Sequence, residues 1–480
     1  MMPYTPEAYQ LLQDGAIALA KAEHVGMRVD ERYLDSALES TASEIKEAQA
    51  AIKESRVTRK WRSRFRQKTN VNSAEQLGKV LFEDMGFDCP EKTETGRYKT
   101  DEETLAKIDH PFIKKYLRIK KIQKGRQFLK GIKEETCEGL LHPVFNLHIP
   151  KTYRSSSDSP NFQNIPVRDE WMKKLVRKAI RARKGRRLVE IDYAGIEVRG
   201  AYCYHRDPTM KKYLLDPSKD MHRDMASDCF KIKPKDPAWW KTKDGKQVRY
   251  TGKNGFVFPE FYGSWWKEVS SNLWSMAEQL KLVVEGGESV REHLESLGIK
   301  RLGLPKPGER DPRSGSFAEH IKKVERHFWE KRFPVYDQWR KDWYSEYLDK
   351  GWFLTKTGFI CQGFMARNDV INYPVQGSSF HCLLKAFIWL VNEELRKARM
   401  KAQVVGQIHD SIVGDVPDEE LQDYIELCRE LMTNRLREFW EWIIIPLEIE
   451  VEVTPVGGSW VEKEEWVSTK GVWQPKEKAA

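Results

Sequence analysis

Two aspartates stand at the ends of apolar segments that are typical of β-strands. Asp192 closes the segment LVEID, and Asp410 follows VVGQIH and directly precedes SIVGDV. Two rigid carboxylates that meet at one sheet edge would offer the hard oxygen ligands that Mg²⁺ prefers. Two Mg²⁺ ions about 3.5–4 Å apart can stabilise both the attacking and the leaving oxygen of a phosphoryl transfer. A single aspartate at a strand end is more often a turn or cap residue, so this interpretation depends on the rest of the sequence.

The segments around these aspartates predict a sheet that is interrupted by a long helical insertion. The candidate strands are 187–192, 403–408, 411–416 and 446–453. The candidate helical regions are 5–56 with a break at Gly26, 102–134, and roughly 218–350 with loops at 231–237, 252–255 and 304–315. The fold class is therefore α+β, with the strands that carry the two aspartates far apart in the sequence.

The composition is that of a folded, basic protein with several domains. The chain has 480 residues, which at about 150 residues per domain suggests roughly three domains. Its net charge of +10 permits a polyanionic partner. The seven cysteines are too widely spaced for CxxC motifs, which favours a reducing compartment. We expect no transmembrane helix and no secretory signal, and hence a soluble, cytoplasmic protein, in the host cytoplasm if the source is viral.

Two stretches in the N-terminal third are strongly basic. Between Lys53 and Lys68 the sequence has eight Lys and Arg residues and one acidic residue, Glu54. A second basic stretch runs from 114 to 126 within the candidate helix 102–134. A solvated helix face is the more frequent explanation of such a run. Two of them in one region also fit a clamp on a phosphate backbone.

Three segments resemble, in order, motifs A, B and C of the family A DNA polymerases. DYAGIEVR at 192–199 resembles motif A, and QIHDS at 407–411 resembles motif C. Between them, Arg249 and Lys253 followed by FYG at 261–263 resemble motif B. Flanking segments at 72–87, 154–168 and 445–462 resemble the thumb, the entry to the palm and the last palm strand. The sequence is therefore identified as a member of this family, in its bacteriophage-like branch.

The resemblance implies a right-hand fold with an antiparallel palm sheet and a largely helical thumb and fingers. The implied activity is template-directed DNA synthesis in replication or repair, in which dNTPs are added to a primer 3′-hydroxyl by two-metal-ion nucleotidyl transfer. The cofactor would be two Mg²⁺ ions, for which Mn²⁺ could substitute. The implied partners are primer-template DNA, dNTPs and a separate exonuclease or processivity factor. The expected divisions are an N-terminal segment, thumb, first palm part, fingers and second palm part, at 1–40, 41–140, 141–215, 216–350 and 351–480.

The resemblance also implies roles for single residues. Asp192, Asp410 and the backbone carbonyl of Tyr193 match the metal ligands. Lys253 matches a catalytic residue that grips the triphosphate and can donate a proton to pyrophosphate, and Glu197 matches the steric gate against a ribose 2′-hydroxyl. The other residues expected at the nucleotide are His222, Arg249, Phe258 and Tyr262. Those expected at the primer-template are Arg154, Gln163, Asn164, Asn372, Gln376 and His409. An Arg and a Gln there could read the minor-groove acceptors that correct base pairs share.

Motif B departs from the family pattern in its spacing. Lys253 and Tyr262 are nine residues apart, one more than usual, and Pro259 lies between them. Because a proline removes a helix hydrogen bond, a kink or bulge is expected. Counting back from Tyr262 places Phe258 beside the nucleotide sugar, with Phe256 as the alternative.

Motif C and the lengths of two segments also differ from the family pattern. Ser411 stands where the family usually has Glu, so we infer that Asp192 and Asp410 suffice to hold the metal ions. A similar extra residue lies between Arg367 and Asn372. The segments 231–247 and 285–316 are expected to hold the excess length of the fingers. We also expect no proofreading domain, because the resemblance to the thumb begins close to the first residue.

Two other classes of protein compete with this interpretation. A single-subunit RNA polymerase shares the palm and often has HDS in motif C, but Glu197 would obstruct a ribonucleotide. A non-catalytic nucleic-acid clamp would have little reason to combine Asp192, Lys253 and Asp410. Primer extension with dNTPs or rNTPs discriminates among the three.

Overall fold

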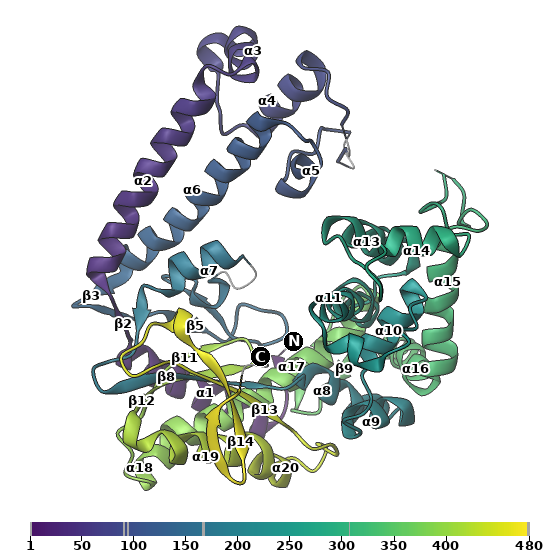
Figure 1. The fold of residues 1–480 in the computed structure, drawn as a ribbon. Helices are drawn as coiled ribbons and strands as arrows, with labels where there is room; N and C mark the ends of the chain where they lie inside the picture. Colours follow the sequence, from purple (N-terminus) through teal and green to yellow (C-terminus); the bar gives the residue numbers. More distant parts are fainter. Residues whose placement is uncertain (1, 90–91, 94–95, 166–168, 307, 478–480) are drawn as a thin grey trace.

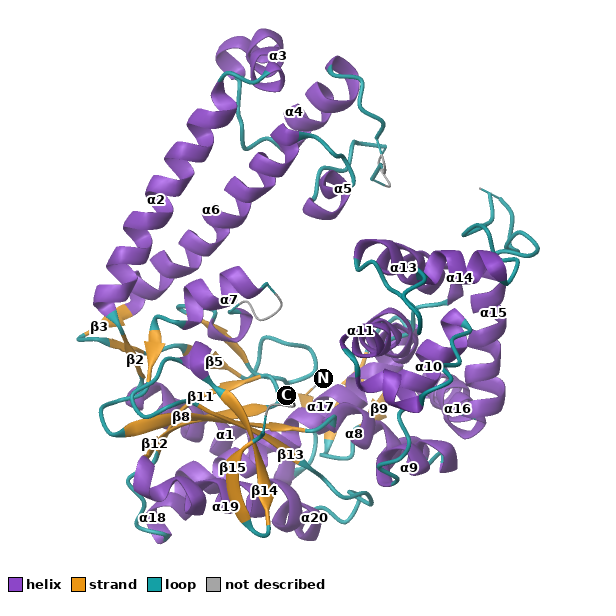
Figure 2. Ribbon diagram, viewed as in Figure 1, coloured by secondary structure: helices purple, strands orange, loops and turns teal. Residues whose placement is uncertain are grey.

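The computed structural model describes residues 2–89, 92–93, 96–165, 169–306 and 308–477. A base that contains most of the strands carries two helical parts, which stand on either side of it (Figure 1). One part is a pair of long helices with smaller helices at its tip, and the other is a group of helices from the middle of the chain. Figure 2 shows the strands gathered in the base. This is the α+β, right-hand architecture that the sequence predicts, with a palm, a thumb and fingers.

The palm is built on a six-stranded antiparallel sheet in the order β11-β12-β8-β13-β14-β15. Its strands are β8 (Arg186–Tyr193), β11 (Gln403–Ile408), β12 (Ser411–Pro417), β13 (Ile449–Val453), β14 (Glu464–Thr469) and β15 (Val472–Pro475). Three of the four predicted strands are confirmed. The fourth begins at Ile449 instead of residue 446, because its partner β8 ends at Tyr193, which is opposite Ile449.

Side chains along β8 point alternately to the palm core and to the opposite face of the sheet. Val189 and Ile191 are fully buried in the palm core, whereas Glu190 and Asp192 lie on the opposite face and are half-buried. Helices cover the core face, and α1 (Pro6–Val25) contacts both β11 and α17. Gly26 ends α1 in a left-handed conformation with φ 66°, which confirms the predicted break. The other base helices are α7 (Glu170–Arg177), α8 (Ile196–His205), α17 (Arg367–Trp389), α18 (Leu395–Lys397), α19 (Leu421–Glu430) and α20 (Leu436–Phe439).

Short strands connect the palm to the other parts. One sheet has the order β1-β10-β9, a second has the order β3-β4-β2-β7, and β5 pairs with β6. Their bounds are β1 (Met2–Pro3), β2 (Met27–Val29), β3 (Thr136–Cys137), β4 (Leu140–Leu141), β5 (Val144–Asn146), β6 (Ser156–Asp158), β7 (Ile180–Arg181), β9 (Trp352–Leu354) and β10 (Phe359–Gln362).

The thumb is a pair of long helices, α2 and α6, with a separate core at its tip. That core is made by Trp61, Leu81, Phe112 and other apolar side chains of the smaller helices and the start of α6. The bounds are α2 (Glu31–Lys53), α3 (Arg56–Phe65), α4 (Ala74–Lys79), α5 (Glu102–Ala106) and α6 (Pro111–Glu135). Asp30 caps the N-terminus of helix α2, which then runs unbroken through residue 40, the expected division between the N-terminal segment and the thumb.

The fingers are helical and have their own core, to which Phe256, Phe317 and Phe328 belong. The bounds are α9 (Pro208–Leu215), α10 (Met221–Phe230), α11 (Lys243–Gly252), α12 (Phe258–Phe261), α13 (Trp266–Gln279), α14 (Val290–Ser296), α15 (Phe317–His327) and α16 (Pro334–Lys350). The segment 285–316, whose purpose the sequence did not reveal, contains α14.

The expected loop at 252–255 is wrong, because these residues are helical. A Cβ atom on Gly252 would lie 2.6 Å from the Cβ of Ala226 and from the carbonyl oxygen of His222. The glycine therefore allows α11 to pack closely on α10. Elsewhere, no helix of the described part of the chain is long and apolar enough to cross a membrane.

Candidate active site

Sheet pairing brings the two predicted metal-binding aspartates to one place. Ser411 pairs with Asp192 across β12 and β8, and Asp410 precedes Ser411 in the turn that follows β11. His409 makes this tight turn possible by adopting φ 50°. Asp192 and Asp410 both line a cavity of about 510 Å³. The other predicted residues that line it are Tyr193, Glu197, His222, Arg249, Lys253, Phe258, Tyr262, Asn372 and Gln376.

The surroundings of both aspartates disfavour the charged carboxylate. Burial raises the pKa of Asp192 to about 7, and the charge of Asp410 adds to this rise. Burial likewise raises the pKa of Asp410 to about 6, although the nearby Arg154 guanidinium opposes the rise. The Arg154 Nη2 atom lies 3.8 Å from Asp410 Oδ1. A cation bound between these two carboxylates would therefore stabilise their charged forms.

The donor set suits a divalent cation. Asp410 Oδ1 is buried and accepts no hydrogen bond from any residue that the structure describes. Asp192 uses Oδ1 to accept the backbone N–H of Tyr193 at 2.8 Å. The carbonyl oxygen of Tyr193 accepts the N–H of Gly195 at 2.9 Å, which leaves its second lone pair for another partner. Among the described residues, no cluster of three or more His, Cys, Asp or Glu side chains is placed to hold a metal ion. The oxygens of Asp192, Asp410 and the Tyr193 carbonyl are the predicted ligands.

The predicted steric gate is held rigidly at the cavity. Glu197, in the first turn of α8, accepts a hydrogen bond from the Tyr262 hydroxyl at 2.5 Å. Its other oxygen accepts a hydrogen bond from Arg154. Burial, together with the charge of Glu197, raises the pKa of Tyr262. Fixed on both sides, the Glu197 carboxylate forms one wall of the cavity between palm and fingers.

A π-helix accommodates the extra residue of motif B. The backbone between α11 and α12 forms one π-helical turn, Lys253–Val257, immediately before the Phe258-Pro259 step. The Phe258 ring consequently lies in the cavity, 5.9 Å from the His222 ring and 5.0 Å from Lys253 Nζ. The Phe256 ring is fully buried and packs edge-on against Phe328, 5.3 Å away. The structure thus places Phe258, the first choice, in the cavity and Phe256 in the fingers core.

Cations line the fingers side of the cavity. Arg249 Nε donates to Asp220 Oδ2 at 2.5 Å, and Asp220 also caps α10. Burial lowers the pKa of His222 to about 4, helped by the charges of Arg249 and Lys253. The His222 ring is therefore neutral near pH 7, and its buried Nδ1 has no hydrogen-bond partner in the described part of the chain. The side chains of Arg249, Lys253 and His222 could therefore bind an anionic ligand in the cavity.

Helix α17 supplies Asn372 and Gln376, two of the predicted primer-template residues, to a third side of the same cavity. Asn372 Nδ2 donates to the carbonyl oxygen of Tyr262 at 3.2 Å, and Gln376 follows one turn later. Gly263 adopts φ 91°, and a Cβ atom there would lie 2.2 Å from Asn368 Oδ1. The glycine therefore lets the end of α12 approach α17.

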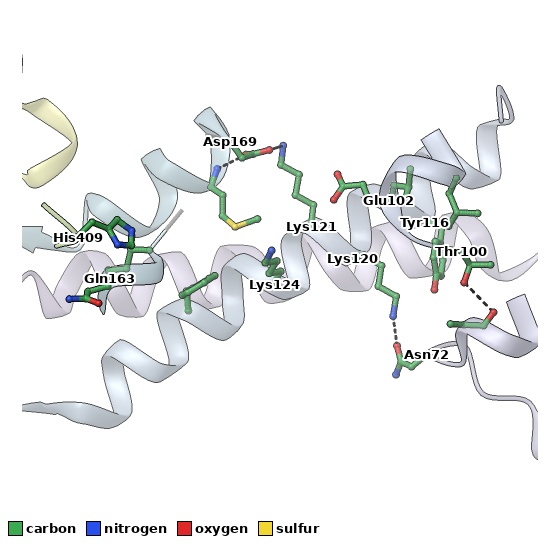
Figure 3. A pocket seen from close by; sticks show the side chains of 16 residues that line it. Asn72, Thr100, Glu102, Tyr116, Lys120, Lys121, Lys124, Gln163, Asp169 and His409 are labelled. Atoms are coloured by element: carbon green, nitrogen blue, oxygen red, sulfur yellow. Dashed lines mark hydrogen bonds and ion pairs between the residues drawn. The ribbon is translucent and has the colours of Figure 1, made fainter. Parts of the chain in front are cut away.

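A second cavity, of about 620 Å³, lies between thumb and palm (Figure 3). Three lysines of α6 line it: Lys120, Lys121 and Lys124. From the palm come Gln163 and His409, two of the predicted primer-template residues. Gln163 is itself buried and donates to Gln407 Oε1 at 2.8 Å. The side chain of Asn164 lies outside the described part of the chain, as do residues 166–168 of the palm-entry segment.

Among the residues that line the 510 Å³ cavity is a carboxylate that was not singled out from the sequence. Glu450 lines it and lies directly opposite Asp192 in the pairing of β13 with β8. Burial and neighbouring acidic residues raise its pKa, whereas Lys253 lowers it. The alternation of Glu and apolar residues in PLEIEVEV places Glu450 on a polar face, but only the register brings it beside Asp192.

This palm, thumb and fingers arrangement is that of the right-hand polymerases. Residues 35–275 and 358–462 match the sequence model of DNA polymerase family A, and the chain belongs to this family. The match omits residues 276–357, which include α14–α16.

Individual relatives agree with this assignment. The chain is 26% identical over 467 residues to DNA polymerase I of Bacillus caldotenax, covering 94% of this chain and 46% of that protein. It is 28% identical over 441 residues to DNA polymerase I of Aquifex aeolicus, covering 91% of this chain and 64% of that protein. The chain thus spans about half the length of several curated relatives. A solved structure, the POL domain of Pol1 from M. smegmatis in complex with DNA primer-template and dNTP, has the same fold, with a TM-score of 0.69 and 24% identity over 94% of this chain and 70% of that one.

Proposed function

We propose that this chain is a DNA-directed DNA polymerase that adds dNTPs to a primer 3′-hydroxyl. The observation that carries the proposal is one cavity in which two carboxylates with raised pKa values face the cations of the fingers. Acidic groups on one side and Arg249 and Lys253 on the other fit a metal-bound triphosphate.

Asp192, Asp410 and the Tyr193 carbonyl would hold divalent cations, most simply two Mg²⁺ ions. When bound, such ions supply positive charge that lowers the pKa of a hydroxyl nucleophile and offsets charge on phosphate oxygens. Lys253, 5.0 Å from the Phe258 ring, orients the triphosphate and can donate a proton to departing pyrophosphate. Arg249 and His222 add phosphate contacts once Arg249 leaves Asp220.

The sugar and base of the nucleotide would lie between Glu197, Phe258 and Tyr262. Glu197 cannot move aside easily, because Tyr262 and Arg154 both hold it. A ribose 2′-hydroxyl would meet this wall, so deoxynucleotides are preferred. Tyr262 is 45% exposed, which leaves its ring available for stacking with a base.

Primer-template DNA would occupy the space between thumb and palm. Lys120 and Lys124 line the cavity there and would contact the phosphate backbone, which supplies most of the affinity of such complexes. Arg154, Asn372, Gln376 and His409 would lie near the primer end. The complex of the M. smegmatis POL domain with DNA and dNTP supports this arrangement through the shared fold.

Primer extension on a defined template tests the proposal. Purified protein with Mg²⁺ receives dNTPs, rNTPs or neither, on primed and unprimed strands. We expect template-dependent extension with dNTPs only. Ser411 in motif C gives the RNA polymerase alternative one specific point of support, so extension with rNTPs alone would replace our proposal with that alternative. The absence of extension with either nucleotide would leave only a nucleic-acid clamp.

A further inference from the structure

Glu450 is a third carboxylate in the cavity that Asp192 and Asp410 line. It lies on β13 directly opposite Asp192 on β8. Residues directly opposite each other in an antiparallel pair project from the same face, with Cβ atoms about 4.5–5.5 Å apart. Asp410 approaches from the other side, because it directly precedes Ser411, which pairs with Asp192 across β12 and β8. Asp192 on the central strand therefore has one carboxylate on its β12 side and one on its β13 side.

The same two strands hold a second pair of opposed acids, and a lysine neutralises it. Glu452 lies opposite Glu190, two residues along the strands from the first pair. The ammonium group of Lys463 bridges the two side chains, at 2.5 Å from Glu190 Oε2 and in contact with Glu452. Like charges directly opposite each other destabilise a sheet. Lys463 therefore offsets a repulsion that the sequence builds into β8 and β13.

The pair of Asp192 and Glu450 has no such lysine. Glu450 makes no ion pair and no side-chain hydrogen bond with any residue that the structure describes. Lys253 lines the same cavity, but its ammonium group lies near the Phe258 ring and forms no ion pair within the described ranges. Arg154 lies on the β12 side, 3.8 Å from Asp410 Oδ1. The charge that would offset this repulsion therefore has to come from a bound cation.

An orphaned oxygen in the same cavity indicates the same kind of ligand. Asp410 Oδ1 is buried and accepts no hydrogen bond from a described residue, and a buried acceptor without a partner is itself costly. Carboxylate oxygens and the Tyr193 carbonyl are hard ligands of the kind that Mg²⁺ and Mn²⁺ take. One divalent cation beside Asp192 would satisfy the Asp410 oxygen and offset the charge of Glu450.

We propose that Glu450 is a positioning residue of the cation site, which strengthens the binding of divalent cations from the β13 side of Asp192. Asp192 and Asp410 are the direct ligands, and Glu450 acts through its charge and through water that the cation retains. The inference rests on the proposed function only for its kinetic consequence, because cation affinity can be measured without DNA or nucleotide.

The first test measures Mn²⁺ binding to the full chain by electron paramagnetic resonance, which counts free Mn²⁺. The variant is Glu450→Gln, and the matched control is Glu452→Gln, which removes an acid from the same face of the same strand where Lys463 already supplies the cation. We expect Glu450→Gln to weaken Mn²⁺ binding about ten-fold, a usual effect of losing a group that supports metal ligands. Glu452→Gln should bind Mn²⁺ as the wild type does.

Thermal unfolding in EDTA adds a readout that a merely structural role would move in the opposite direction. Glu450→Gln removes one of two opposed charges, so it should melt at no lower temperature than the wild type. Glu452→Gln removes a partner of Lys463 and should melt at a lower temperature. In single-nucleotide incorporation, Glu450→Gln should need about ten-fold more Mg²⁺ for its half-maximal rate.

Three results would each overturn the inference: wild-type Mn²⁺ affinity in Glu450→Gln, an equal loss of affinity in Glu452→Gln, or a lower melting temperature of Glu450→Gln in EDTA. The proposed function fails separately. If the chain binds Mn²⁺ with the expected pattern but extends no primer, the proposed function is wrong and the inference stands.

Discussion

Replacing Asp192 with Asn should stabilise the metal-free protein at alkaline pH. Burial, with the added charge of Asp410, raises the pKa of Asp192 to about 7. A carboxyl whose pKa is higher in the folded than in the unfolded state binds more protons when folded, so stability falls as pH rises through that window. The loss of folding stability caused by Asp192 is small at a pH near the ordinary pKa of about 3.9 and reaches its full size above about pH 7. Asn keeps the oxygen that accepts the Tyr193 N–H and removes the charge.

The magnitude follows from the size of the shift. About three pKa units correspond to roughly 4 kcal/mol, and local relaxation and solvent reduce this to about 2–4 kcal/mol. We expect Asp192→Asn to unfold at higher denaturant concentration than the wild type at about pH 8.5 in EDTA, with the difference shrinking by more than half at about pH 5. Mg²⁺ should stabilise the wild type and not the variant.

Asp220→Asn is a matched control, because its effect on the stability of the protein should have the opposite sign. Hydrogen bonds from Arg249 and from its own helix outweigh burial and lower the pKa of Asp220. The stability that Asp220 contributes is present above its unfolded pKa, so Asp220→Asn should lose stability at alkaline pH and lose less in acid. Equal behaviour of the two variants, or an Asp192→Asn protein that is less stable than the wild type in EDTA at about pH 8.5, would refute the electrostatic reasoning.

Two further substitutions test the nucleotide site. Glu197→Ala should raise incorporation of ribonucleotides relative to deoxyribonucleotides, since excluding one hydroxyl is worth on the order of a few kcal/mol; unchanged sugar selectivity in competition assays would remove the steric-gate role. Phe258→Tyr should increase acceptance of dideoxynucleotides, because a hydroxyl there could replace the interaction lost with the 3′-OH, and Phe256→Tyr in the fingers core is the control. A response of the control alone in chain-termination assays would contradict the position of Phe258.

The sequence predicted the parts of this fold whose signal is local. Strand β8 and the hairpin β11–β12 are short apolar runs bounded by turn residues, and such runs form strands wherever the sheet is completed. The aspartates at their ends were therefore found without coordinates. The resemblance to the family then related distant segments to one another, which local patterns alone could not do.

The features that the sequence did not reveal depend on packing between distant segments. The sequence predicts a loop at Gly252, whereas this glycine allows close contact between α11 and α10. The extra residue of motif B predicts either a kink or a bulge, and the structure has a π-helical turn over Lys253–Val257 that leaves Phe256 packed on Phe328. The position of Glu450 opposite Asp192 depends on the register of β13 against β8.

Single-turnover incorporation of one correct dNTP by the wild type and Asp410→Ala tests the central claim most directly. Primer-template affinity is measured on the same samples by fluorescence anisotropy. Because phosphate contacts supply most of the binding energy and the cavity carboxylates act on the chemical step, we predict that Asp410→Ala loses incorporation and keeps nearly the wild-type DNA affinity. Incorporation by Asp410→Ala at close to the wild-type rate would contradict the assignment of this cavity as the polymerase active site.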